Sequence, residues 1–334
     1  MTLQFRSSPL AVSHVTGSEL GGALLGRAVA VAAAGWPLQA ISAPLLGADM
    51  AAVQETWLRA AGPLQHGVSE GIAWRRAGDA LFGVIDLDEA EFAAAGRPPL
   101  QAASEAAYDR IFRLLEAQQL PHLWRVWNYM ADINAETHGL ERYRQFNVGR
   151  QDAFLAHHRS ATGNVPAACA IGLADGPLSI AFLAGQAPVV PFENPRQVSA
   201  YHYPSEYGPR APTFSRAALV QPSGQELLFV SGTASILGHR TMHPDDVAAQ
   251  GREAMANIAA VVAEVNRAVR SRPFALDELV YRVYVRHAAD FPVVRDALAS
   301  RLGAAEVRYV QADICRADLL LEIEAMATHA LGQD

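Results

Sequence analysis

The stretch DELVYRVYVRHAADF, residues 277–291, decides the fold of this 334-residue chain. Its centre is a run of valine and tyrosine, the β-branched and aromatic residues that favour a strand. The preceding segment, PDDVAAQGREAMANIAAVVAEVNRAV at 244–269, has apolar residues from Val247 to Val265 at spacings of three, four and seven. Such spacing places them on one stripe of a helix. The sequence therefore predicts an amphipathic helix followed by a strand.

The same order of elements occurs twice, which suggests duplicated units. In the later copy we expect strand, helix, strand, helix and closing strands at 226–232, 244–269, 277–291, 291–303 and 307–326. The earlier copy repeats this order at 81–87, 102–119, 123–133, 139–158 and 167–184. Aligning GPLSIAFLA (176–184) with ADLLLEIEA (317–325) sets Glu322 opposite Ala181. Only one copy therefore carries the acid.

Composition excludes several classes of function. Apolar residues make up 51% of the chain, charged residues 18%, and the net charge is -7. This balance is typical of a compact folded protein, and it argues against a nucleic-acid partner because phosphate binding needs a positive face. The N-terminus lacks a signal-peptide pattern, and the apolar stretch at 21–52 is broken by Arg27, Pro37, Pro44 and Asp49. We therefore expect no membrane segment and a cytoplasmic location.

The combined count of 27 lysines and arginines consists of arginine alone. Without lysine, Schiff-base catalysis and the lysine of a phosphate-binding loop are excluded. Anions must then be bound by arginine, whose planar guanidinium matches a carboxylate. Cys169 and Cys315 form neither a disulfide framework nor a zinc motif. We expect no metal and no organic cofactor.

Three stretches carry the residues suited to chemistry: RYRQFNVGRQDAF (142–154), PRQVSAYHYPSEYGPRAPTFSR (195–216) and LLLEIEA (319–325). The first two supply arginines and tyrosines for a small polyanion, and the third places Glu322 in an apolar run where a carboxyl group can keep its proton. Together they resemble the chorismatase family, enzymes that remove pyruvate from chorismate. The segment 195–216 is the most specific part of this resemblance.

The later copy also resembles the small trimeric RidA/YjgF fold, in which helices pack on one face of a sheet. The resemblance rests on Gln250, Asn257, the strand at 280–291 and LEIEAMA at 321–327. Chorismatases contain three such units in one chain, so the resemblance implies an α+β protein of tandem RidA/YjgF-like, chorismate mutase-like domains with pseudo-threefold symmetry. The residues alone support two copies. The resemblance implies a monomer with an internal pseudo-trimer. Its parts are a degenerate N-terminal domain (1–93), a central domain (94–194) and a C-terminal domain with the glutamate (195–334).

The helix at 139–158 carries Arg142, Tyr143, Arg144 and Arg150. Positions 143 and 150 share a face, whereas Arg142 and Arg144 point away from one another, so these residues cannot all bind one ligand. A solvated helix face is the alternative for each arginine. The resemblance favours Arg142 and Arg150 as substrate-binding residues, and Tyr143 is assigned equally to packing or to the site.

The connection from 187 to 217 contains six prolines and several aromatic residues. Its length and aromatic content predict an ordered loop that lines a site at the junction of the two copies. By resemblance, Tyr203 and Arg216 contact the substrate. The resemblance points less specifically to three neighbours as substrate contacts: Tyr201, Tyr207 and Arg210. Tyr207 is equally suited to packing within the loop.

Glu322 and Glu324 alternate along a strand and face the same way. A buried glutamate is costly unless it is protonated or paired, so one of the two is expected to have a raised pKa. We choose Glu322 as the catalytic acid, because its position in LEIEA matches the glutamate of the RidA-like ligand cleft. A surface salt bridge is the alternative.

Gly232 and Cys315 occupy positions at which chorismatase subtypes differ. Glycine and cysteine here resemble the members that release 3-hydroxybenzoate, which implies that Gly232 borders the substrate and that Cys315 takes part in the reaction. Inert packing is the alternative for a buried cysteine. Cys315 precedes Glu322 by seven residues, so a turn near Arg316 to Asp318 must bring the two to one face.

Chorismate carries two carboxylates, a ring hydroxyl and an acid-labile enol ether. The resemblance implies that Glu322 protonates the ether and that the ring hydroxyl displaces pyruvate, giving 3-hydroxybenzoate and, in some relatives, 4-hydroxybenzoate as well. Two rival functions remain open. One is a RidA-like imine or enamine deaminase, in which Arg308 would hold a carboxylate, and the other is a non-catalytic small-ligand-binding protein.

Overall fold

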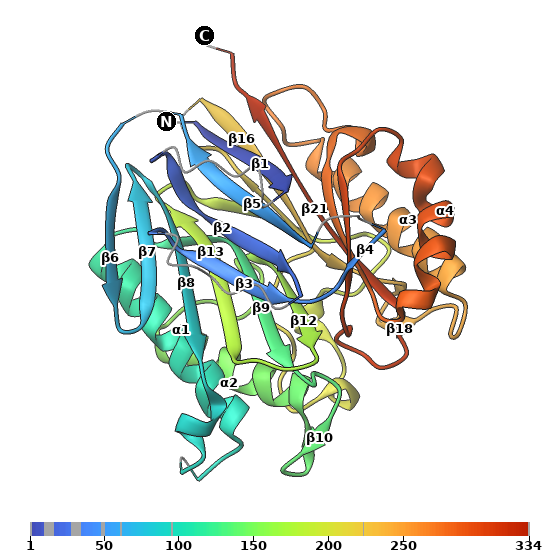
Figure 1. The fold of residues 1–334 in the computed structure, drawn as a ribbon, viewed down its shortest axis with the longest axis horizontal. Coiled ribbons are helices and arrows are strands. Elements are labelled where there is room, and N and C mark those ends of the chain that lie inside the picture. The colour runs from blue at the N-terminus through green and yellow to red at the C-terminus, as the bar shows by residue number, and fades with distance from the viewer. Residues whose placement is uncertain are drawn as a thin grey trace.

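The structure of the chain is a computed structural model, which describes residues 2–9, 17–27, 35–47, 51–60, 62–94, 96–222 and 224–332. Three main sheets contribute to one shared apolar core (Figure 1), formed by side chains from all three parts of the chain. Trp57, Phe82 and Phe229 are examples, one from each sheet. Among the described residues, no helix is long and apolar enough to cross a membrane.

The central sheet has six strands in the spatial order β12-β9-β13-β8-β7-β6. In chain order, β6 to β9, β12 and β13 span Gln65–Ser69, Ile72–Ala77, Ala80–Leu87, His122–Ala131, Ala167–Leu173 and Leu178–Gly185. Helix α1 (Pro99–Ala117) joins β8 to β9, and α2 (Arg142–Ala156) lies between β9 and the parallel strand β12. The order expected for the earlier copy is confirmed. A two-stranded hairpin of β10 (Glu136–Thr137) and β11 (Leu140–Glu141) precedes α2.

The C-terminal sheet has seven strands in the order β14-β15-β16-β21-β19-β20-β4. In that order they span Val189–Phe192, Ala217–Val220, Gln225–Thr233, Leu321–Ala330, Val280–Val285, Val307–Gln311 and Leu45–Leu46. Helix α3 (Val247–Val265) is capped by the Asp246 side chain, and α4 (Phe291–Leu302) precedes β20. The strands β16-β21-β19-β20 thus repeat the arrangement β8-β13-β9-β12, and the later copy is confirmed too.

The N-terminal sheet keeps the same order without the helices. Its strands lie as β1-β5-β2-β3 and span Leu3–Pro9, Ala52–Arg59, Glu19–Gly26 and Leu38–Ser42. The pair β2 and β3 is parallel, like the pairs β9 and β12 and β19 and β20 of the other two sheets. Within the described part of this segment no helix is present. The fold is therefore the expected α+β arrangement of three related units, and the described part of the N-terminal unit is a sheet.

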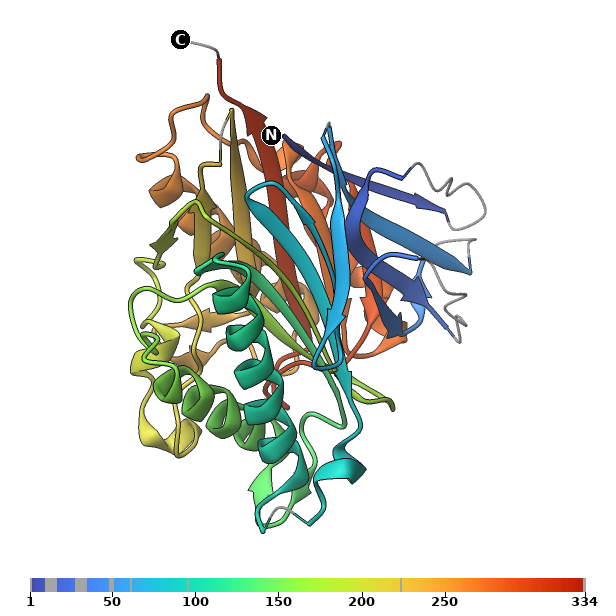
Figure 2. The same ribbon diagram turned by 90° about the vertical axis from the view of Figure 1, so that its left-hand side faces the viewer.

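Helices cover only the outer faces of two sheets. Helices α1 and α2 pack on the central sheet, and α3 and α4 pack on the C-terminal sheet (Figures 1 and 2). Each helical layer has its own apolar cluster, in which Phe112 and Phe154 join α1 to α2 and Ile258 and Leu298 join α3 to α4. The opposite faces of the sheets are left to meet one another. Any site between units must therefore lie along these sheet junctions.

Strand pairing corrects the expected unit boundaries. Strands β6, β7 and β8 precede residue 94, yet they belong to the central sheet, where β8 pairs with β13 over its whole length. The central unit consequently begins near Gln65. At the other boundary, β14 precedes residue 195 but pairs with β15 of the C-terminal sheet. Strands β6, β7 and β14 extend the two sheets beyond the repeated core, so composition could not show to which sheet they belong.

Candidate active site

A cavity of about 330 Å³ lies between the central and C-terminal units. One wall comes from α2 and β12, and the other from β16, the β17–β18 hairpin (Ile236–Leu237 and Arg240–Thr241) and the start of β21. The loop after β14 covers it, as expected from its sequence. Three acidic residues line the cavity: Glu141, Asp318 and Glu322. Five arginines also line it: Arg144, Arg150, Arg216, Arg240 and Arg316.

Glu322 lies on β21 with its side chain 4% exposed and its carboxyl group in the cavity wall. Burial is the main cause that raises the pKa of this carboxyl group to about 8, and the negative charge of Glu324 is the second. Arg125 and Arg216 act in the opposite direction. A carboxyl group with such a pKa carries its proton at neutral pH and can donate it to a substrate.

Gly232 on β16 faces this carboxyl group. A Cβ atom at position 232 would collide with Oε1 of Glu322 and would also crowd Cβ of Cys169. The absence of a side chain therefore allows Glu322 to occupy its present position. The geometry gives a steric reason for glycine at this point.

Cys315 lies beside Glu322, with Sγ 3.9 Å from Oε2. Strand β20 ends at Gln311 and β21 begins at Leu321, and a turn over 315–318 separates the two residues. The expected turn is present. Burial, followed by the charge of Glu322, raises the pKa of the Cys315 thiol, which is therefore neutral at pH 7.

Arg150 and Arg216 face the cavity from opposite units and are almost fully buried. Arg150 donates to Oδ1 of Asn147 at 2.8 Å, and Arg216 donates to the Tyr203 hydroxyl at 2.8 Å and to the Val198 carbonyl at 2.9 Å. Their partners are neutral, and the Nε atom of each has no hydrogen-bond partner. Buried guanidinium groups with unused donors can hold carboxylates.

The aromatic loop is fixed over the cavity by its tyrosines. Its 3-10 turns span Ala200–His202 and Ser205–Tyr207. The Tyr203 and Tyr207 rings cover the Arg316 guanidinium at 5.1 and 4.1 Å, and the Tyr207 hydroxyl lies 3.1 Å from Nδ1 of His239. Both tyrosines line the cavity, whereas Tyr201 and Arg210 do not.

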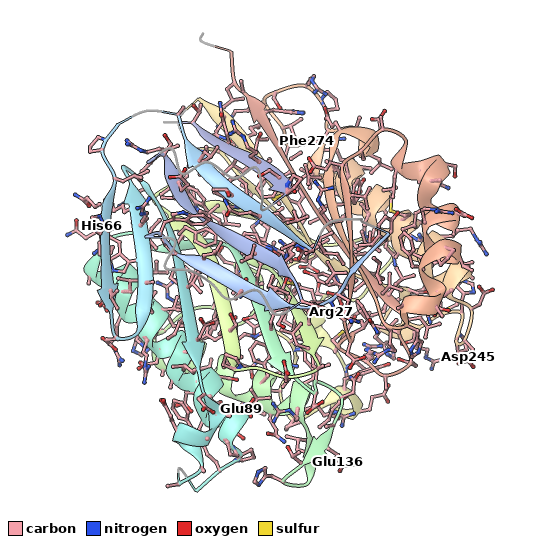
Figure 3. The ribbon with its side chains drawn as sticks, viewed as in Figure 1. Arg27, His66, Glu89, Glu136, Asp245 and Phe274 are labelled. Atoms are coloured by element: carbon pink, nitrogen blue, oxygen red, sulfur yellow. The ribbon has the colours of Figure 1, made fainter. Side chains whose placement is uncertain are left out.

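Arg142 does not take part in this cavity, which corrects the prediction for it. Its guanidinium donates to the Ala131 carbonyl at 2.9 Å and forms a two-pronged ion pair with Glu89, at 2.9 and 2.5 Å. Figure 3 shows Glu89 and Glu136 at the same end of the molecule. Glu89 follows β8 and meets the start of α2 from outside the site. The α2 face that carries Tyr143 and Arg150 lines the cavity instead.

Three cavity arginines were not chosen from the sequence. The resemblance favours Arg142 and Arg150 over Arg144, and the sequence offers no argument for Arg240 or Arg316 as ligands. Arg316 donates to the His239 carbonyl at 2.9 Å and keeps one buried nitrogen, Nη2, without a partner. The one sequence feature that points to Arg316 as a cavity residue is its position directly after Cys315.

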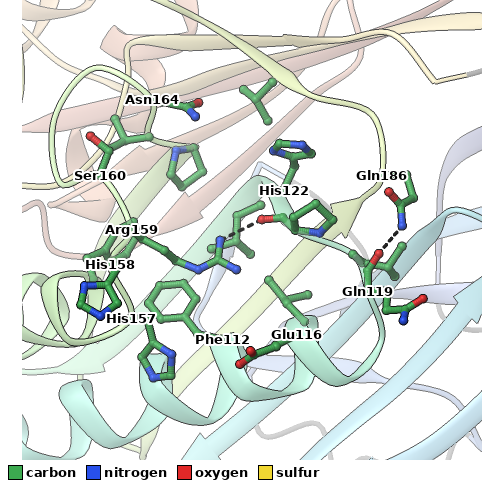
Figure 4. Close-up of a pocket in the computed structure, with 18 residues that line it drawn as sticks. Phe112, Glu116, Gln119, His122, His157, His158, Arg159, Ser160, Asn164 and Gln186 are labelled. Atoms are coloured by element: carbon green, nitrogen blue, oxygen red, sulfur yellow. Dashed lines mark hydrogen bonds between the residues drawn. The ribbon is translucent and has the colours of Figure 1, made fainter.

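A second cavity, of about 710 Å³, lies at the C-terminal ends of α1 and α2 (Figure 4). Its Arg159 donates to the Pro121 carbonyl at 2.8 Å and stacks on Phe112 at 4.5 Å. His157 is paired with Asp109 at 2.7 Å. These basic side chains complement the carbonyl ends of two helices. The smaller cavity alone combines unpaired buried donors with a carboxyl group of raised pKa.

The fold of three related sheets places a buried acid beside a cluster of arginines at one junction, an arrangement suited to an enzyme that acts on a small anion. Comparison with known proteins agrees. The chorismatase FkbO/Hyg5-like N-terminal family model matches residues 55–184. A chorismatase from Streptomyces rapamycinicus is 42% identical over 81% of each chain, and a 3-hydroxybenzoate synthase from Streptomyces hygroscopicus is 38% identical over 81% of this chain and 80% of its own.

A crystal structure of a chorismatase superposes with a TM-score of 0.86, at 36% identity over 98% of both chains. The chain belongs to the chorismatase family.

Proposed function

We propose that this protein converts chorismate to pyruvate and a hydroxybenzoate, with 3-hydroxybenzoate as the main product. The observation that carries the proposal is that Glu322, with its pKa raised to about 8, shares one cavity with five arginines. Family membership and the name 3-hydroxybenzoate synthase of one relative support it. The dianionic substrate needs both features, since its carboxylates must be held while its ether is protonated.

In the proposed reaction, Glu322 gives its proton to the methylene carbon of the enol ether, and an oxocarbenium ion forms. The bond between the ring carbon and the ether oxygen then breaks, its electron pair goes to the oxygen, and pyruvate leaves. The ring hydroxyl oxygen attacks the vacated carbon, and its proton returns to the Glu322 carboxylate. The resulting arene oxide opens and loses a ring proton to give the hydroxybenzoate. Substrate atoms are conserved, and no water is consumed.

The arginines would position the substrate before proton transfer. Arg150 and Arg216 lie on opposite walls, so each can hold one carboxylate while Tyr203 and Gly232 border the ring. Holding reacting groups in place lowers the entropic part of the barrier. Arg316 and Arg144 add donors that sequence reasoning did not assign.

The deaminase alternative is disfavoured by Arg308. Its guanidinium is paired with Glu306 at 2.6 Å and with the Ser7 hydroxyl at 3.1 Å, at the junction of the C-terminal and N-terminal sheets. It is therefore occupied by protein groups and lies apart from Glu322. The cavity beside Glu322 contains the arginines and tyrosines that the chorismate reaction would use, which supports the proposal.

The test is to incubate purified protein with chorismate and to measure pyruvate and aromatic products by chromatography. We expect pyruvate and hydroxybenzoate in equal amounts, above the spontaneous decay measured with Glu322→Gln. A dihydrodiol as the main product would mean that water, and not the ring hydroxyl, is the nucleophile. Absence of pyruvate above the background would refute the proposed function.

A further inference from the structure

Beneath Glu322 lies a second buried carboxylate on the same strand. Glu324 follows by two residues, so the side chains share a face about 6 to 7 Å apart. Glu324 accepts hydrogen bonds from Arg125 and from the Tyr284 hydroxyl, the latter at 3.1 Å, and forms an ion pair with Arg282 at 3.0 Å. It is 6% exposed. A charge so enclosed acts on its neighbours with little screening from water.

Arg282 links this pair to the N-terminal sheet. It forms an ion pair with Glu55 of β5 and donates to the Tyr129 hydroxyl at 2.6 Å. We call Glu55, Arg125, Arg282 and Glu324 the junction network. Its members come from all three units, and its two arginines and two carboxylates balance in charge.

Glu322 stands next to the junction network without being an ion-pair partner in it. Its polar contact in the described structure is Cys315. Besides Arg125 and Glu324, the titratable and charged groups around it are Tyr284, its cross-strand partner on β19, and those of the cavity, chiefly Cys169, Cys315, Tyr143, Arg150 and Arg216. The cavity side has five arginines against Glu141 and Asp318 and is therefore positive, and the negative charge that acts most strongly on Glu322 is that of Glu324 in the junction network.

We propose that, in addition to burial, the charge balance of the junction network keeps the Glu322 carboxyl group in its neutral, proton-donating form, because its two carboxylates offset its two arginines. Through Glu55, the N-terminal unit then contributes to a site that it does not line. The inference rests on the proposed role of Glu322 as the acid. If Glu324 or Glu55 lost its charge, the two arginines would outnumber the remaining carboxylate. The excess positive charge would then favour the ionised form of Glu322, so that Glu322 would have lost its proton at neutral pH and could not act as the acid.

The experiment compares Glu55→Gln, Glu324→Gln and Arg125→Gln with the parent protein. The ionisation of Glu322 is followed by infrared difference titration of its carboxyl band, identified as the band that Glu322→Gln lacks. The pH profile of kcat/KM with chorismate is measured in parallel. Glu55 and Glu324 act here as positioning residues, and a purely structural role would not move either titration curve.

We expect the two glutamate variants to lower the titration midpoint of Glu322 by about one pH unit or more, and Arg125→Gln to raise it. The alkaline limb of kcat/KM should move with the midpoint, in opposite directions for the two kinds of variant. In the double variant Glu55→Gln/Arg125→Gln, the midpoint should return toward that of the parent because one charge of each sign is removed. Glu70→Gln, at an exposed ion pair with Arg113, serves as the control and should leave the profile unchanged.

Thermal unfolding and circular dichroism establish that each variant is folded at the pH values used. If a glutamate variant does not fold, Arg125→Gln still tests the opposite sign, since it leaves Arg282 with both carboxylates. A Glu322 midpoint that stays fixed in the folded variants overturns the inference. The infrared titration needs no substrate, so failure of chorismate turnover would refute the proposed function without deciding this point.

Discussion

The Sγ atom of Cys315 lies 3.9 Å from Oε2 of Glu322, and the turn over 315–318 brings together two residues that a continuous strand would set on opposite faces. The thiol thus occupies space next to the proton donor, and burial keeps it neutral by raising its pKa. A neutral thiol at this point fills volume that water would otherwise take.

Cys315→Ala should therefore change which product forms more than it changes chorismate consumption. With the thiol removed, water gains access to the oxocarbenium ion, and a dihydrodiol should appear beside the hydroxybenzoates. Chromatography of 3-hydroxybenzoate, 4-hydroxybenzoate and dihydrodiol measures the ratio. An unchanged ratio would assign Cys315 to packing alone, at a stability cost of roughly 1 kcal/mol.

Glu322→Gln should lower kcat by roughly 100- to 10,000-fold, the usual contribution of a general acid, while a non-reacting substrate analogue still binds. The amide keeps the shape of the side chain and cannot supply the proton. Steady-state kinetics and calorimetric titration with the analogue measure the two effects. A variant that retained more than about a tenth of the parent rate would exclude Glu322 as the acid.

The same substitution should stabilise the protein in alkaline solution. The pKa of Glu322 rises from 4.5 to about 8 on folding, so between these values the folded state binds more protons than the unfolded state. Stability is therefore greatest below the lower value and falls as the pH rises toward the higher one, by up to about 1.4 kcal/mol per pH unit. We expect the Tm of Glu322→Gln minus that of the parent to increase as the pH rises from about 5 to about 8. Parallel Tm curves would contradict the raised pKa.

Arg150→Ala and Arg216→Ala should each reduce kcat/KM for chorismate, by an amount equivalent to roughly 2 to 5 kcal/mol, because each removes a buried partner of a carboxylate. Lysine at either position should restore little, since the planar fork is lost. Arg142→Ala is the matched control, because this arginine lies on the same helix as Arg150 and is paired with Glu89 outside the cavity. Equal kinetics in all three alanine variants would place the carboxylate-binding groups elsewhere.

The repeated units could be predicted from the sequence because their helices and strands have strong periodicity. The N-terminal unit has no helix in its described part, and its sheet is held by pairs such as Leu3 with Arg59, which no local pattern reveals. For the same reason the boundary at residue 94 was wrong, since β8 joins the central sheet through β13, some ninety residues later in the chain.

Local sequence likewise identified only part of the site. Glu322 stood out because it interrupts an apolar strand, whereas Arg150 was favoured only through the family resemblance. Arg142 was misassigned because its partner, Glu89, lies 53 residues away. The ion pairs Arg125 with Glu324 and Arg282 with Glu55 join residues 199 and 227 positions apart, a separation at which one sequence carries no signal.

The two arginines and two glutamates at the junction of the units also bear on why the three units share one chain. Three identical subunits around a threefold axis can supply each residue only in multiples of three. A set of two and two cannot be built that way. Covalent linkage removes that arithmetic constraint, because each position around the axis can then mutate independently. The fused chain can thus keep one buried acid in one cleft, with Ala181 at the matching position of the central unit, instead of repeating the acid in every unit.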